Sequence, residues 1–268
     1  MPRARLAAAV LLAVLASACD RGRAPPAQDA ATSIPPAAAP VVLADVVETT
    51  PNYIVGISYP KSAAKYPELA RALQAYADAA RGELMRAVQG LGGQKPTAPY
   101  DLSLQFTGLV DTPGIVVVAA DGSSYTGGAH GNPLVERFTW LPDRNELLTA
   151  EKLVVAPDGW QVVADAAREQ LMTGLAQRLD ADAVEGPDRA AMLENGSKMI
   201  ADGTAPKAAN FARFEPVVDA DGRIRALRFV FPPYQVGPYS DGTRTADVPA
   251  AVLLPVLAPE YRRLFRGG

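Results

Sequence analysis

Two long segments with a helical repeat interrupt a chain that otherwise consists of short strand-like runs, and this alternation limits the fold more than any other feature. Apolar residues recur at three- and four-residue steps, or their sums, from Pro67 to about Gln89. A second stripe contains Val163, Ala167, Leu171, Leu175 and Leu179. Each pattern predicts an amphipathic helix that buries one face.

The remaining segments have strand-like patterns separated by turn residues. Asp121–Gly122 and Asp221–Gly222 are both expected to form hairpin turns, because Asp-Gly is a strong hairpin signal. Strand runs beside long helices predict an α+β fold, with antiparallel sheets and amphipathic helices packed on one face. The predicted strands are 41–59 (one or two strands), 100–106, 115–120, 123–126, 134–140, 211–218, 224–231 and 243–248.

Turn and capping residues suggest where the helices begin and end. Asp158–Gln161 looks like a capping box that opens the second helix, and Gly186–Pro187 is expected to end it. A shorter helical piece is expected to stop near Asn195–Gly196. Pro249 is expected to open a final helix that runs through Leu253 toward Leu257.

The N-terminus has the layout of a secretory signal. Arg3 and Arg5 precede a short apolar run, residues 6–15, which is too short to span a bilayer. Small residues then lead to Cys19, the only cysteine, and this stretch resembles a bacterial lipobox. The resemblance implies removal of residues 1–18 and lipidation of Cys19. The alternative is an ordinary signal peptide, cut after the Ala-Ser-Ala sequence.

Residues 19–42 are expected to form a tether rich in proline and alanine, which has little to bury. A lipid on Cys19 would place the folded part at a membrane, facing the periplasm. Asp20 follows the cysteine directly, and in enteric-type lipoproteins an aspartate there is associated with the inner membrane. The outer membrane is the alternative location. With no second cysteine, the exported part is expected to depend on its core rather than on disulfides.

The charge balance is mildly acidic. The chain has 26 Lys plus Arg against 29 Asp plus Glu, and loss of Arg3 and Arg5 with the signal would leave 24 against 29, a balance of −5. This balance argues against sequence-independent nucleic-acid binding, which depends on Lys and Arg neutralising phosphates. It is compatible with a cationic partner.

Two segments have the composition of shaped loops. Ser124–Pro133 contains His130, the only histidine, together with three glycines and an Asn-Pro pair. Pro232–Gly242 contains Tyr234 and Tyr239 among prolines and glycines. We expect these loops to form the functional surface, because binding residues concentrate on loops that a rigid scaffold positions.

These two segments, Tyr125–His130 and Phe229–Gly242, resemble an extracytoplasmic family, the DUF4163 plus DUF3298 pair, also called PdaC/RsiV-like. The resemblance implies a DUF4163 region at 43–150 and a DUF3298 region at 151–268. Family members include the lysozyme-sensing ectodomain of an anti-sigma factor and the non-catalytic region of a peptidoglycan deacetylase. Others are stand-alone lipoproteins, and this chain is most similar to that group.

The residue inventory argues against several kinds of chemistry. One histidine and one cysteine cannot supply a zinc site of three or four such ligands, and we expect no metal and no cofactor. Asp219–Gly222 has acidic residues that suit calcium, but the spaced ligands and distal glutamate of an EF-hand loop are missing. No phosphate-binding or dinucleotide-binding glycine motif is present.

Three interpretations of His130 remain open. It could stabilise its own loop, line a recognition surface, or act as the base of a hydrolase with Ser123 or Ser124. Tyr234 and Tyr239 either pack at the edge of the hydrophobic core or form an aromatic platform for a sugar ring or a protein partner. The candidate ligand-binding residues are Tyr125, Gly127, Gly128, His130, Tyr234 and Tyr239, and no residue is assigned as catalytic.

The leading hypothesis is a non-catalytic envelope lipoprotein that binds peptidoglycan or a lysozyme-like muramidase. Its acidic balance would attract a basic muramidase. The alternatives are a hydrolase of envelope ester or glycan bonds that uses His130, and a structural interaction protein of the envelope.

Overall fold

The computed structural model describes residues 41–268. The predicted signal segment 1–18, Cys19, Asp20 and all but the last two residues of the predicted tether lie outside the described part of the chain. Within residues 41–268, no helix is both long and apolar enough to cross a membrane.

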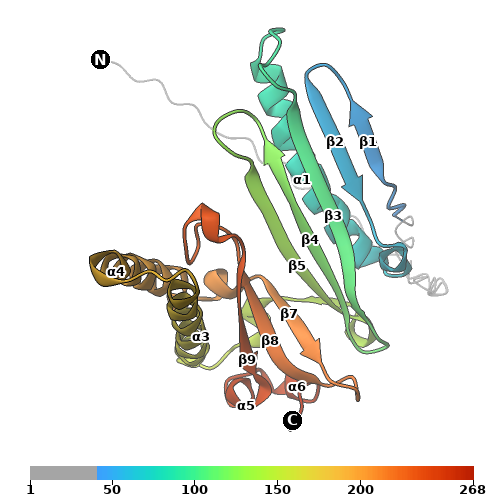
Figure 1. Ribbon diagram of the computed structural model, residues 1–268. Helices are drawn as coiled ribbons and strands as arrows, with labels where there is room; N and C mark the ends of the chain where they lie inside the picture. The colour runs from blue at the N-terminus through green and yellow to red at the C-terminus, as the bar shows by residue number, and fades with distance from the viewer. Residues whose placement is uncertain (1–40) are drawn as a thin grey trace, which may run out of the picture. The chain divides into compact units, whose positions relative to one another are not determined.

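The first half of the described chain forms a six-stranded sheet in sequential order (Figure 1). Neighbouring strands are antiparallel except β2 and β3, which are parallel because α1 connects them as a crossover. The strands are β1 (Val46–Thr49), β2 (Tyr53–Ser58), β3 (Tyr100–Asp111), β4 (Val116–Tyr125), β5 (Asn132–Leu141) and β6 (Glu146–Leu148).

Helix α1 (Pro67–Gly90) covers one face of this sheet (Figure 1). Its buried stripe packs on alternate residues of β2 to β5, as the helical and strand periods require. The cluster includes Leu69, Leu73 and Leu84 from the helix and Leu102 and Leu104 from β3. The predicted helix from Pro67 to about Gln89 is therefore confirmed, together with its buried face.

Strand β4 corrects one prediction. It runs straight through Asp121–Gly122, where a hairpin turn was expected. A Cβ atom on Gly122 would lie 2.0 Å from the main-chain oxygen of Ser103 on β3. The glycine therefore permits close approach of two strands rather than a turn, which is the other common role of glycine inside a strand.

The second half of the described chain forms a three-stranded antiparallel sheet with helices beside it (Figure 1). The predicted hairpin around Asp221–Gly222 is confirmed, since Gly222 has φ +74° and connects β7 to β8. The elements are α2 (Ala150–Leu153), α3 (Gly159–Ala181), α4 (Gly186–Gly203), β7 (Phe214–Val218), β8 (Ile224–Phe231), β9 (Arg244–Pro249), α5 (Ala250–Leu253) and α6 (Pro259–Arg262). Short 3-10 helices are η1 (Lys61–Lys65), η2 (Pro142–Arg144), η3 (Ala208–Phe211) and η4 (Tyr239–Asp241).

Two helix-end predictions were wrong. Asp158 precedes α3, but its side chain makes no capping hydrogen bond, so the predicted capping box does not form. Helix α4 continues through Asn195–Gly196 to Gly203. A Cβ atom on Gly196 would lie 2.6 Å from a methyl carbon of Leu175 on α3. This glycine allows the two helices to pack closely instead of ending α4.

The two sheets are linked by hydrophobic and ionic contacts. Val117 of β4 and Leu141 of β5 join the hydrophobic cluster of the C-terminal half. The side chain of Arg137 on β5 is 9% exposed. It donates hydrogen bonds to the carboxylates of Glu215 on β7, at 2.8 Å, and Asp121 on β4, at 3.0 Å. The guanidinium of Arg137 therefore links β4, β5 and β7. The α+β class is confirmed, with one mixed and one antiparallel sheet.

Candidate ligand-binding face

The glycine-rich loop connects β4 to β5. Gly127 and Gly128 have φ values of +100° and +101°, a conformation that favours glycine. The loop closes where Ser124 pairs with Asn132 across the two strands. His130 therefore lies on an exposed turn at the end of a long, regular hairpin.

The second loop, Pro232–Gly242, leaves the end of β8 and is anchored at three points. The side-chain amide of Gln235 donates to the main-chain oxygens of Gly203, at 3.0 Å, and Asn210, at 2.9 Å. Val236 is 4% exposed and packs into the C-terminal core. Asp241 accepts a 2.7 Å hydrogen bond from Arg178 on α3. The anchored loop leaves Tyr234 exposed and Tyr239 half-buried.

The two loops meet through three rings, His130, Tyr234 and Tyr239, which we call the aromatic cluster. The rings of His130 and Tyr239 stack with centroids 4.0 Å apart and planes at 17°. The hydroxyl of Tyr234 lies 2.9 Å from Nε2 of His130. The ring centroids of Tyr234 and Tyr239 are 5.6 Å apart. The cluster thus joins residues from the two loops that the sequence had singled out.

Tyr234 has a strained backbone. Its φ is +72°, which is unfavourable for a bulky side chain by about 1–2 kcal/mol. Its amide donates to the main-chain oxygen of Gly237 at 3.0 Å, which closes a turn around the strained residue. The side chain is 56% exposed, although it is a large aromatic. Strain combined with exposure is typical of a residue held in place for recognition.

The contacts of His130 do not form a catalytic triad. Its Nδ1 lies 3.1 Å from the main-chain oxygen of Gly131, which can only accept, so Nδ1 carries a proton. In the neutral ring, Nε2 then accepts from the hydroxyl of Tyr234. Both ring nitrogens are occupied, neither by a carboxylate nor by Ser123 or Ser124. The two ring nitrogens of His130 therefore contact one group in each of the two loops.

Tyr125, Gly127 and Gly128 do not join the aromatic cluster. They line a separate hollow of about 320 Å³ together with Lys95 and Tyr100. The hydroxyl of Tyr125 donates to the main-chain oxygen of Gly128 at 3.3 Å. The six candidate residues therefore divide into two groups, one in the aromatic cluster and one lining this hollow.

Asp219 has a structural role in the β7–β8 turn. Its Oδ1 accepts hydrogen bonds from the main-chain amides of Asp221, at 3.0 Å, and Arg223, at 2.9 Å. This is the Asx-type turn that aspartate commonly forms. In residues 41–268, no three His, Cys, Asp or Glu side chains gather as a metal site.

The sequence did not identify the anchors of the second loop. Gln235 lies within the Phe229–Gly242 segment and Arg178 within the predicted second helix, but neither was assigned a role in holding the loop. Asp241, in the same segment, accepts a hydrogen bond from Arg178 and lies 3.4 Å from Arg244. Their roles depend on contacts between segments far apart in the chain, which no local pattern records.

Two solved structures are similar in fold to this chain. A DUF3298 family protein from Pseudomonas aeruginosa PAO1 aligns with 84% of this chain and 94% of its own, at 18% identity and a TM-score of 0.54. The chain has the fold of this DUF3298 protein. A second DUF3298 family member, from Bacteroides fragilis NCTC 9343, aligns with 81% of this chain and 93% of its own, at 15% identity and a TM-score of 0.50. No family model and no curated protein matches the sequence.

Proposed function

We propose that the chain is an extracytoplasmic, non-catalytic binding module of the DUF3298 type, and that the aromatic cluster is its docking surface. The observation that carries this proposal is the exposed Tyr234, held at a positive φ and hydrogen-bonded to His130. The shared fold and the two loop motifs support the DUF3298 assignment. The lipobox-like sequence at Cys19 supports attachment to a periplasm-facing membrane surface.

The proposed ligand is a lysozyme-like muramidase, with peptidoglycan itself as the alternative. Tyrosine combines a large contact area with a polar hydroxyl, and a fixed cluster of such rings is typical of binding hot spots. The acidic balance of the chain would attract a basic muramidase over long range. A sugar ring stacked on Tyr234 would use the same surface.

Co-sedimentation and pull-down at physiological salt test this proposal. The full-length protein is offered lysozyme in one arm and purified sacculi in the other. The Tyr234→Ala/Tyr239→Ala variant is expected to lose at least about tenfold in affinity, since hot-spot residues contribute 2 kcal/mol or more. Binding to the muramidase should weaken as salt is raised, while stacking on glycan should depend little on salt.

Tyr125→Ala is the matched control, because it removes a tyrosine of the glycine-rich loop that lies outside the aromatic cluster. It should bind as well as the wild type. If Tyr125→Ala loses binding and the double variant keeps it, the hollow beside Lys95 is the docking site instead. If the wild type binds neither lysozyme nor sacculi, the proposed function is wrong.

A further inference from the structure

We propose that a groove between α3, α4 and the second loop is a separate binding site for a single uncharged aliphatic chain. The groove encloses about 260 Å³. It is distinct from the docking surface, because none of the rings of the aromatic cluster lines it, although the second loop contributes to both.

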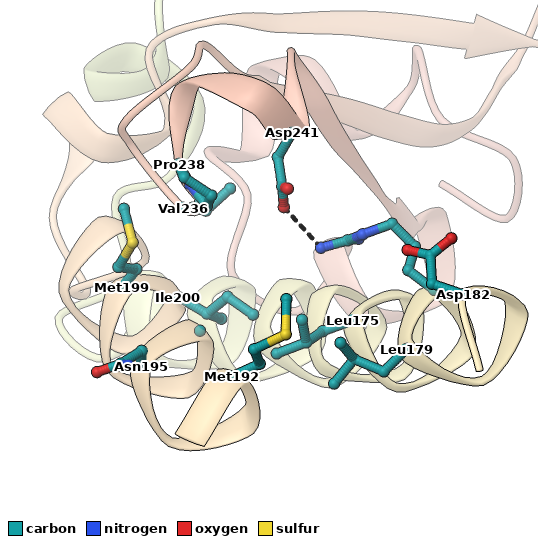
Figure 2. A pocket seen from close by; sticks show the side chains of 13 residues that line it. Leu175, Leu179, Asp182, Met192, Asn195, Met199, Ile200, Val236, Pro238 and Asp241 are labelled. Carbon is teal, nitrogen blue, oxygen red and sulfur yellow. Dashed lines mark hydrogen bonds and ion pairs between the residues drawn. The ribbon is translucent and has the colours of Figure 1, made fainter. Parts of the chain in front are cut away.

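The lining of the groove is mainly aliphatic and thioether (Figure 2). Leu175 and Leu179 come from α3, Met192 and Ile200 come from α4, and Val236 comes from the loop. Met192 is 50% exposed and lines the groove, so part of its apolar side chain is accessible from solvent. Methionine side chains are flexible and adapt to irregular apolar ligands.

The walls of the groove are fixed before any ligand arrives. Gly196 allows α4 to approach Leu175 closely, which sets the spacing of the two helices. The loop forms the third wall, and Gln235 and Asp241 anchor it to α4 and α3. A preformed apolar cavity avoids the cost of ordering its walls on binding.

The charges around the groove favour an uncharged ligand. Arg178 and Arg244 both approach the carboxylate of Asp241, at 2.7 and 3.4 Å, and Figure 2 shows the contact with Arg178. Of these three groups only Arg178 and Asp241 line the groove, and their opposite charges offset each other there. Asp182 also lines the groove and forms no ion pair within residues 41–268. Its carboxylate would repel an anionic head group such as that of a free fatty acid.

The size of the groove limits the ligand to one chain. Sites for drug-sized molecules usually enclose about 300–1,000 Å³, and this groove is slightly smaller. A linear alcohol, ester or amide that carries one aliphatic chain fits both the volume and the charge pattern.

Fluorescence titration with N-phenyl-1-naphthylamine, a neutral apolar probe, tests the site on the full-length chain in detergent-free buffer. The expected result is a saturable rise in emission that decan-1-ol reverses and that decanoate reverses at least about tenfold less effectively. Asp182→Asn should reduce this preference for the alcohol. No saturable signal in the wild type, or equal displacement by alcohol and carboxylate, would overturn the proposal.

A charged substitution at the mouth of the groove separates this site from nonspecific apolar binding. Met192→Glu places a charge among apolar walls and should weaken probe binding at least about tenfold. Met192→Leu keeps the apolar lining and should bind like the wild type. Circular dichroism and thermal melting of both variants establish that they are folded. Undiminished probe binding by a folded Met192→Glu protein would also overturn the proposal.

Discussion

The hydroxyl of Tyr234 lies 2.9 Å from Nε2 of His130, although 104 residues separate them in the chain. One residue lies on the β4–β5 loop and the other on the loop after β8, so the contact joins the two halves of the described chain. The same histidine stacks on Tyr239. The only imidazole in the sequence is therefore the centre of the proposed docking surface.

The strain at Tyr234 predicts an unusual order of stabilities. At φ +72°, Tyr234→Gly should be more stable than Tyr234→Ala by about 1 kcal/mol, because glycine tolerates this conformation. Tyr239 begins a 3-10 helix and has no positive φ. At this position the Tyr239→Gly variant should be less stable than the Tyr239→Ala variant by about 0.5–1 kcal/mol. Urea denaturation of the four variants checks this reversal, and the same order at both positions would contradict the strain.

Two glycine-to-alanine substitutions should have opposite effects on stability, because only one of the two glycines packs against the second loop. A Cβ atom on Gly203 would lie 1.9 Å from the main-chain oxygen of Gln235, so Gly203→Ala should destabilise the fold by about 1–3 kcal/mol. Gly174, inside α3, meets only the end of Arg178 at 4.0 Å. Gly174→Ala should be stabilising by up to about 1 kcal/mol. Thermal melting measures both changes. An unchanged melting temperature for Gly203→Ala would contradict the described packing of the loop on α4.

The lowered pKa of Glu146 predicts that the protein loses stability in acid. Partial burial alone would raise its pKa, but hydrogen bonds from Lys152, Arg144 and Tyr261 outweigh this and lower the pKa from 4.5 to about 2. The carboxylate therefore contributes stability above pH 4.5, and that contribution is lost as the pH falls from 4.5 toward 2. Its hydrogen bond to Tyr261, at 3.0 Å, connects β6 to α6.

Glu146→Gln should lower the free energy of unfolding by about 1–3 kcal/mol at pH 7 and much less near pH 2. Asp143→Asn is the control, since Asp143 is exposed and forms no ion pair among residues 41–268. Denaturation measured from pH 7 to pH 2 checks the difference. An equal effect of Glu146→Gln at both ends of this range would contradict the assignment.

Local sequence patterns predicted most of the elements but not the roles of several glycines. The stripe of α3 and the Asp221–Gly222 hairpin follow from short-range periodicity and turn chemistry. Asp121–Gly122 and Asn195–Gly196 have the same local signature as a turn. Both glycines instead make room for a neighbouring element, Ser103 on β3 and Leu175 on α3. Only the tertiary structure distinguishes these two uses of glycine.

The candidate site was predictable in part, for a similar reason. Loop composition identified His130, Tyr234 and Tyr239, and the structure brings these three together. The same reasoning included Tyr125, which lines a hollow with Lys95 and Tyr100 instead, because nothing in the sequence shows which residues its ring contacts. The apolar groove was missed, because its α3 residues were assigned to the core.

Because the chain has one histidine, NMR of its imidazole tests the docking surface most directly. The ring resonances of His130 are followed while lysozyme, or a soluble peptidoglycan fragment, is added to the labelled protein. We expect a saturable shift with one of these ligands, and no shift in the Tyr234→Ala/Tyr239→Ala variant. Binding detected by calorimetry that leaves the imidazole signals unmoved would contradict the assignment of the aromatic cluster as the docking surface.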